Sequence, residues 1–145
     1  MTIYFDMDGT IADLYGTENW LHRLRSSDPT PYTEAKPMLH FSTLARLLNQ
    51  LQRKGINIGI ISWTSKNGSA TYNQAVTEAK RKWLERHLPS VRFNETHIVC
   101  YGYPKELFKN EGDILFDDEA KNRLDWGFGA YTPEEIFTVL KALRF

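Results

Sequence analysis

Two pairs of aspartates are the residues of this sequence best suited to chemistry. Asp6 and Asp8 stand in the segment DMDGT, and Asp117 and Asp118 follow the apolar segment ILF. Carboxylates this close together are costly to bury unless they are paired or bind a cation. Their oxygens are also the ligands that Mg²⁺ prefers in proteins. The two pairs together predict a cation site that could neutralise the charge of a phosphate.

Each pair taken alone also has a structural interpretation. The first could be a solvated turn, and the second a polar strand exit or helix cap that leads into EAKNRL. An EF-hand loop is excluded for the first pair, because Thr10 takes its fifth position and no glutamate stands at its twelfth. Two acidic strand ends in one small domain are hard to explain as caps, which favours the cation site.

A phosphoryl site also needs hydrogen-bond donors. Ser62 is the first residue after the apolar segment INIGII, so its hydroxyl and the next backbone N–H groups could face a phosphate oxygen. Thr64 and Ser65 follow closely and stay open as alternatives. Lys105 opens the segment KELF, ahead of the second acidic pair. Its structural alternative is an ordinary surface lysine.

These residues must be positioned by strands that alternate with helices. Short apolar and β-branched segments predict strands at 2–5, 56–61, 97–100, 114–116 and 128–131. This alternation predicts an α/β fold with a Rossmann-like parallel sheet and helices on both faces. Ligands bind such a sheet at the carboxyl ends of its strands. We therefore expect Asp6, Ser62 and Asp117 to converge at one edge.

Apolar residues at helical spacing predict helices over 42–54 and 71–87 and a last helix that ends near 143. Ser42 is the expected N-cap of the first, and Gly55 ends it. Thr132 and Glu135 should form a capping box at the start of the last. A short helix is expected within 14–25. The segment 26–37 contains three prolines and is expected to be a loop.

Composition and charge narrow the class of protein. A chain of 145 residues suits a single domain over 1–145. The formal net charge is zero and the 18 basic residues are scattered, which gives no strong signal for nucleic-acid binding. The absence of a long apolar run and of a signal-like start predicts a cytoplasmic protein without a membrane span. The single cysteine, Cys100, excludes an internal disulfide and a cysteine-based zinc site.

In its motifs the sequence resembles phosphatases of the haloacid dehalogenase (HAD) superfamily. The first family motif, DxDG[TV], is similar to the segment from Asp6 to Thr10. The second family motif is a Ser or Thr after an apolar strand, and Ser62 is similar to it. The third is a lysine ahead of the last acidic strand, and Lys105 is similar to it. The final motif, two acids after an apolar strand, is similar to Asp117-Asp118. All four occur in order and span nearly the whole chain. The first and last are specific.

The resemblance implies a HAD-like fold and Mg²⁺-dependent hydrolysis of a phosphomonoester through an aspartyl-phosphate. Asp6 would be the nucleophile, and Asp8 the general acid and then the general base. Mg²⁺ would be bound by Asp6, by the backbone carbonyl of Asp8 and by Asp118, with Asp117 beside these ligands or beside Lys105. Ser62 and Lys105 would hold the transferring oxygens. The non-enzymatic alternative is a HAD-fold protein that binds a nucleotide without turnover.

The segment 14–37 is too short for a large cap domain and is expected to form a flap or mini-cap. An open site of this kind suits a large substrate, or closure by a second subunit of a homo-oligomer. The layout is also similar to that of 5'(3')-deoxyribonucleotidases and polynucleotide 3'-phosphatases, so the expected partner is a phosphorylated small molecule, a nucleotide or a nucleic-acid end. The candidate substrate-binding residues are Thr10, Tyr15, Trp20, Trp63 and Thr64. The aromatic ones could stack on a base, or could pack the flap onto the core.

A receiver-like signalling domain is the main rival that also uses phosphoryl chemistry. Such a domain also places acids, a Ser or Thr and a lysine at strand ends. Its phosphorylated aspartate should end the third strand, however. Here the third predicted strand ends in Cys100-Tyr101, which disfavours this interpretation.

Overall fold

Five parallel strands form the central sheet of the computed structural model, which describes all 145 residues. The strands are β1 (Thr2–Phe5), β4 (Asn57–Trp63), β5 (Glu95–Val99), β6 (Ile114–Phe116) and β7 (Ala130–Tyr131). Their order in the sheet is β5-β4-β1-β6-β7, so the first strand of the chain lies at the centre. The predicted Rossmann-like α/β architecture is confirmed.

Strand β1 is central because both of its faces are apolar. Ile3 and Phe5 pack into the larger hydrophobic cluster, and Tyr4 packs into a smaller one on the opposite face. Successive side chains of a strand point to opposite faces, so a strand buried on both sides needs a nearly continuous apolar run. The segment TIYF meets this need, and all four of its residues are buried.

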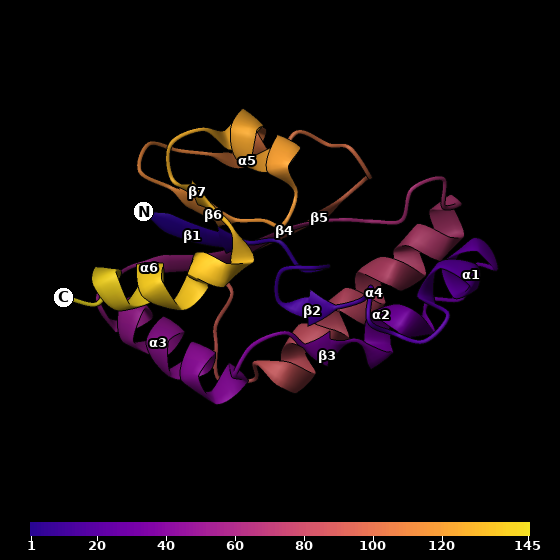
Figure 1. Cartoon of the computed structure of the whole chain (residues 1–145), viewed down its shortest axis with the longest axis horizontal. Coiled ribbons are helices and arrows are strands. Elements are labelled where there is room, and N and C mark those ends of the chain that lie inside the picture. Colours follow the sequence, from indigo (N-terminus) through magenta and orange to yellow (C-terminus); the bar gives the residue numbers. More distant parts are fainter.

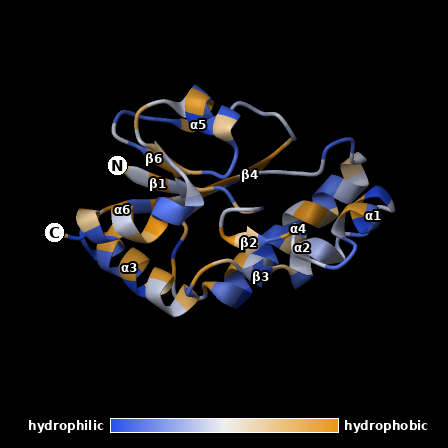
Figure 2. Ribbon diagram, in the orientation of Figure 1, coloured by the Kyte–Doolittle hydropathy of each residue, from blue (hydrophilic) through white to orange (hydrophobic).

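Helices cover both faces of the sheet (Figure 1). On one face lie α3 (Phe41–Arg53), α6 (Ile136–Leu143) and the C-terminal half of α4 (Ala70–His87), whose apolar residues share the larger cluster. On the other face lie α5 (Ala120–Trp126) and the short 3₁₀ helix η1 (Lys105–Phe108). Apolar and polar residues alternate around α3 and α6, as expected for helices with one buried face (Figure 2). No helix is long and apolar enough to cross a bilayer.

Several boundaries differ from the sequence-based expectation. Helix α3 is capped by His40 and not by Ser42, because the His40 ring accepts a hydrogen bond from the N–H of Thr43. Strand β4 continues to Trp63, so Ser62 lies inside the strand and not after it. Strand β5 ends at Val99, one residue before the predicted end.

The segment 14–37 contains more regular secondary structure than predicted. The expected short helix begins at Trp20 as α1 (Trp20–Arg25), and a second helix, α2 (Thr30–Glu34), occupies part of the expected loop. Pro31 is tolerated because it stands in the first turn of α2, where its missing N–H is not needed. The short antiparallel strands β2 (Ala12–Asp13) and β3 (Lys36–Pro37) pair at the base of this segment.

Ion pairs and apolar packing hold the flap together. Arg23 on α1 donates hydrogen bonds to Asp28, at 3.1 Å, and to both carboxylate oxygens of Glu34, at 2.9 Å. Tyr32 packs with residues of α4 in a separate buried cluster. The flap therefore lies against the N-terminal half of α4, where Figure 1 shows α1, α2 and α4 side by side.

The predicted capping box is confirmed and offers a test of local stability. The Glu135 carboxylate accepts hydrogen bonds from the backbone N–H of Thr132, at 3.1 Å, and from its hydroxyl, at 3.0 Å. We expect Thr132→Ala to lower the free energy of unfolding by about 1 kcal/mol, because the N–H of Glu135 in the first turn loses the Thr132 side chain as its acceptor. Thr132→Ser should stay close to wild type in urea denaturation. An equal loss in both variants would contradict the capping role.

Candidate active site

The carboxyl ends of β1 and β6 bring the predicted acids together. Asp6 follows β1 directly, and Asp117 and Asp118 follow β6. Lys105, from η1, connects them: its ammonium lies 2.9 Å from Oδ1 of Asp6 and 2.7 Å from Oδ2 of Asp117. Lys105 is 2% exposed, so it is not the surface lysine that the sequence left as an alternative.

A tight turn shapes the segment from Asp6 to Thr10. The Met7 carbonyl accepts hydrogen bonds from three successive backbone N–H groups, at 2.9 to 3.1 Å. Gly9 has a φ of 79°, and a Cβ there would collide with the carboxylate of Asp118. Glycine is therefore required at this position both by its backbone conformation and by the close approach of the second acidic pair.

Three of the acids form a cluster that could bind a metal ion. Carboxylate oxygens of Asp6, Asp117 and Asp118 all lie within 4.8 Å of one another. The Thr10 hydroxyl donates to Oδ2 of Asp6, at 3.0 Å, and accepts from the N–H of Asp118, at 3.1 Å. Thr10 is 1% exposed and does not line the cavity, so its predicted contact with substrate is corrected: it positions the acids.

The two adjacent acids have different surroundings. Asp117 is fully buried, and its carboxylate accepts from Lys105, from the Asn122 amide at 3.2 Å and from the N–H of Glu119 at 2.9 Å. Both acids border the cavity, but Asp118 is partly exposed, and its nearest donor is the Thr10 hydroxyl at 3.4 Å. The oxygens of Asp118 are therefore available to a cation, whereas those of Asp117 are occupied.

The electrostatics of this cluster favour the binding of a cation. Burial raises the pKa of Asp117 and of Asp118, and the nearby carboxylate of Asp6 raises both further. Each pKa shift reflects the free-energy cost of holding several carboxylates close together in a site shielded from water. A bound divalent cation would remove this cost.

Asp8 belongs to a different group of contacts. Its Oδ2 lies 2.8 Å from the ammonium of Lys80, a lysine of α4 that is 1% exposed. Lys80 also donates to the Ser62 hydroxyl and to the Trp63 carbonyl, each at 2.7 Å. Sequence reasoning missed Lys80. Its signal is a lysine on the face of α4 that is otherwise apolar.

Ser62 is placed differently from the expectation. It is fully buried inside β4, its hydroxyl accepts from Lys80, and it does not line the cavity. Thr64, the alternative that the sequence left open, lies just after the strand and does line it. The structure therefore favours Thr64 over Ser62 as the hydroxyl that can face a phosphate.

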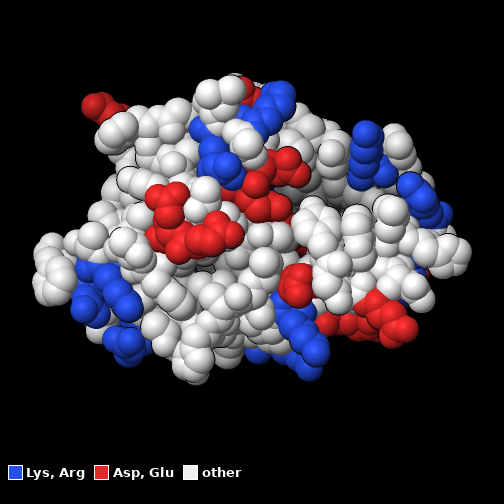
Figure 3. Space-filling model, viewed as in Figure 1, with Lys and Arg blue, Asp and Glu red and all other residues white.

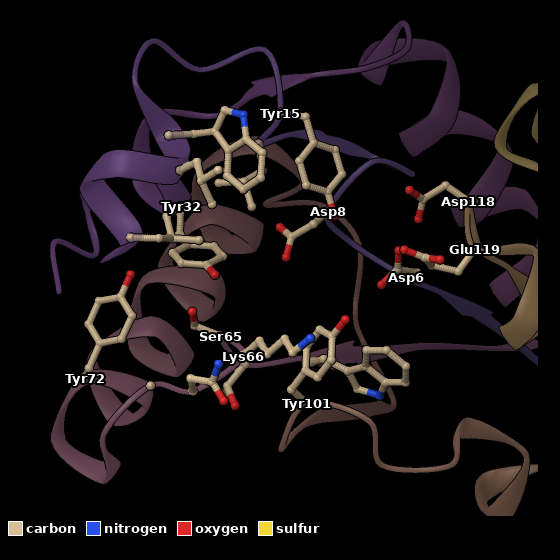
Figure 4. Close-up of a pocket in the computed structure, with 18 of the residues that line it drawn as sticks. Asp6, Asp8, Tyr15, Tyr32, Ser65, Lys66, Tyr72, Tyr101, Asp118 and Glu119 are labelled. Atoms are coloured by element: carbon tan, nitrogen blue, oxygen red, sulfur yellow. The ribbon is translucent and has the colours of Figure 1, made fainter. Parts of the chain in front are cut away.

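A cavity of about 610 Å³ opens beside these groups. Asp8 lies near its middle, Asp6, Asp118 and Glu119 lie on one side, and Tyr32 and Tyr72 lie on the other (Figure 4). On the outer surface of the molecule, acidic side chains gather around the central hollow and basic side chains flank them (Figure 3).

Three of the predicted aromatic residues line this cavity. In the flap, Tyr15 and Trp20 meet edge to face, with ring centroids 5.0 Å apart, and Trp20 also packs against the buried cluster of the flap. Trp63 lies at the end of β4, where its indole N–H donates to the Tyr103 carbonyl at 2.9 Å. Its ring centroid is 5.2 Å from the ammonium of Lys105. Aromatic rings therefore stand on both the flap and the sheet side of the cavity.

Comparisons with known proteins agree with the fold. No family model matches the sequence, and no curated protein matches it. Among solved structures, the chain is similar to a chain of the Pnkp1/Rnl/Hen1 complex, with a TM-score of 0.55 and 17% sequence identity. The match covers 90% of this chain and 44% of that one, so this chain spans less than half the length of its neighbour. At this identity the likeness concerns the fold alone, a Rossmann-like α/β sheet.

Proposed function

We propose that this protein is a Mg²⁺-dependent phosphomonoester hydrolase of the HAD type. The observation that carries the proposal is the setting of Asp6. It directly follows the central strand, its two oxygens are held by Lys105 and Thr10, and two further acids lie within ligand distance. The order of the four motifs along the chain supports the same conclusion.

The residues present fit a divalent cation. The three clustered carboxylates of Asp6, Asp117 and Asp118 share one ammonium group, that of Lys105, so two negative charges remain when all three acids are ionised. Asp6 and Asp118, with the backbone carbonyl of Asp8, would hold Mg²⁺, which prefers oxygen ligands. When bound, the cation would neutralise charge on the transferring phosphate.

In the proposed reaction Asp6 forms a bond to phosphorus as the ester oxygen leaves, and Asp8 gives that oxygen its proton. Asp8 then takes a proton from water, which attacks the aspartyl-phosphate and releases phosphate and Asp6. Lys105 lies beside Asp6 and would hold the oxygens that carry the developing charge. The Thr64 hydroxyl, which also lines the cavity, would donate to a phosphate oxygen.

The cavity favours a substrate with an aromatic group. About 610 Å³ is more than a phosphate alone needs, and the flap and β4 each contribute aromatic rings. Bases stack on such rings whatever their sequence. We therefore infer that the substrate is a nucleotide or a nucleic-acid end.

A screen for phosphate release tests this function. The candidates are p-nitrophenyl phosphate, nucleotides, sugar phosphates, and DNA and RNA ends, each with Mg²⁺ present and then chelated. Release that needs the cation supports the proposal. Tight nucleotide binding without release from any compound would instead favour a binding protein that does not turn its ligand over.

Trp20 offers a test of the substrate class. We expect Trp20→Ala to raise the KM for a nucleotide about tenfold, because a stacked base contributes about 1–3 kcal/mol. Hydrolysis of a sugar phosphate, which has no aromatic ring to stack, should change less than about twofold on the same reasoning. Trp20→Phe keeps an aromatic ring and is the matched control. Equal losses on both substrates, with a lower melting temperature, would mean that Trp20 supports the flap and does not recognise a base.

A further inference from the structure

Lys80 is a buried lysine whose protons are all used within the protein. It is 1% exposed and shares one face of α4 with the buried residues Val76, Trp83 and Leu84. Its ammonium donates to Oδ2 of Asp8 at 2.8 Å, and to the Ser62 hydroxyl and the Trp63 carbonyl at 2.7 Å. Burying a lysine is costly, and an apolar residue would serve packing better. The contacts of Lys80 must therefore explain its presence.

These contacts join two parts of the site that are far apart in sequence. Asp8 comes from the turn after β1, and Ser62 and Trp63 come from the end of β4. The Tyr32 ring, centred 5.1 Å from the ammonium, closes the flap side of Lys80. Lys80 thus sits behind Asp8 and does not line the cavity, whereas Asp8 does.

The hydrogen bond from Lys80 makes the two oxygens of Asp8 unequal. Oδ2 is held by the ammonium, and no protein group donates to Oδ1. The Asp8 side chain is 18% exposed, at the middle of the cavity (Figure 4). One oxygen is therefore fixed from behind while the other is left for a substrate.

We propose that Lys80 is a positioning residue that holds Asp8 so that its free oxygen delivers the proton to the leaving group. The inference rests on the proposed function. In this step the O–H bond of Asp8 breaks as a new O–H bond forms on the departing oxygen. Lys80 keeps its own protons and does not touch the substrate. The competing explanation is that Lys80 supports β4 and the loop after it, which carries Thr64.

Leaving groups of different basicity separate these two roles. A nitrophenolate leaves readily without a proton, whereas an alkoxide needs one. We expect Lys80→Met to lower kcat/KM for benzyl phosphate about 100-fold, for phenyl phosphate by an intermediate factor, and for p-nitrophenyl phosphate less than about threefold, following the usual size of general acid catalysis. The comparison uses kcat/KM, because this ratio reports only the steps up to and including departure of the alcohol.

The matched control is Lys82→Met on the same helix. Lys82 is 70% exposed and pairs with Glu78 on the surface at 3.4 Å. It should behave as wild type on all three substrates. A loss that is equal on the three substrates in Lys80→Met would overturn the positioning role and assign Lys80 to support of the fold.

A double-mutant cycle tests independently whether Lys80 acts through Asp8. If Lys80 acts through Asp8, Lys80→Met should cause no further loss in an Asp8→Asn background. A further loss there overturns the inference. The double variant also removes the unpaired charge that could unfold Lys80→Met alone, and melting temperatures verify folding. If wild type releases neither alcohol from these three substrates nor phosphate from nucleotides and nucleic-acid ends, the proposed function fails, which differs from every result that concerns Lys80 itself.

Discussion

Replacing Asp6 with asparagine is expected to lower phosphate release by at least about 10⁴-fold, as removal of a catalytic nucleophile normally does. The amide cannot attack phosphorus, and it is a poorer ligand for a cation than a carboxylate. The fold should persist, because the amide has the same shape and its oxygen can still accept the hydrogen bond that Lys105 donates to Asp6 at 2.9 Å.

Phosphate release and thermal unfolding are measured on the same preparations. Asp125→Asn is the matched control, since Asp125 lies on the outer surface of α5, where it pairs with Lys121. It should retain wild-type activity. If Asp6→Asn kept more than about a tenth of the activity, Asp6 would not be the nucleophile, because such a loss is far below the usual effect.

Removal of the cation should have an effect of similar size. Chelation is expected to stop phosphate release, and added Mg²⁺ should restore it, because the three clustered carboxylates share only one ammonium group. Without a cation, the negative phosphate would meet an excess of negative charge. Activity that survives exhaustive chelation would contradict a metal-dependent mechanism.

The two adjacent acids should respond differently. Asp118→Ala is expected to raise the Mg²⁺ concentration needed for half-maximal activity at least about tenfold, since its oxygens are the available ones. Asp117→Ala should affect metal binding less and stability more, because it leaves Lys105 buried without one of its partners, a loss of about 3–5 kcal/mol for buried pairs. Magnesium titrations of activity and of melting temperature measure both effects. A bound cation that contacts Asp117 and not Asp118 would reverse the assignment.

Local sequence patterns determined the architecture of this protein. Apolar runs predicted the five strands, and leucines at helical spacing predicted α3, because burial imposes the period of each element on its residues. Parallel strands place their carboxyl ends at one edge, so the convergence of Asp6 with Asp117 and Asp118 followed from the fold class. The capping box of the last helix was also predictable, because it depends on residues only three positions apart.

Boundaries were less predictable because several residue types can satisfy the same backbone groups. A histidine ring caps α3 where a serine stood two residues later. The helix α2 forms in a proline-rich segment because packing of Tyr32 against α4 outweighs weak local propensity. Strand β4 extends past its apolar run because the Ser62 hydroxyl, although buried, is satisfied by Lys80.

The tertiary structure alone decided the roles within the site. In sequence, Asp117 and Asp118 are equivalent neighbours, yet Asp117 is fully buried against Lys105 and Asn122, whereas Asp118 is partly exposed at the cavity. Lys80 reaches Asp8 across 72 positions of the chain. Contacts between residues so far apart produce no periodic pattern in the sequence. They depend on how helices and loops pack together and not on the burial of one element.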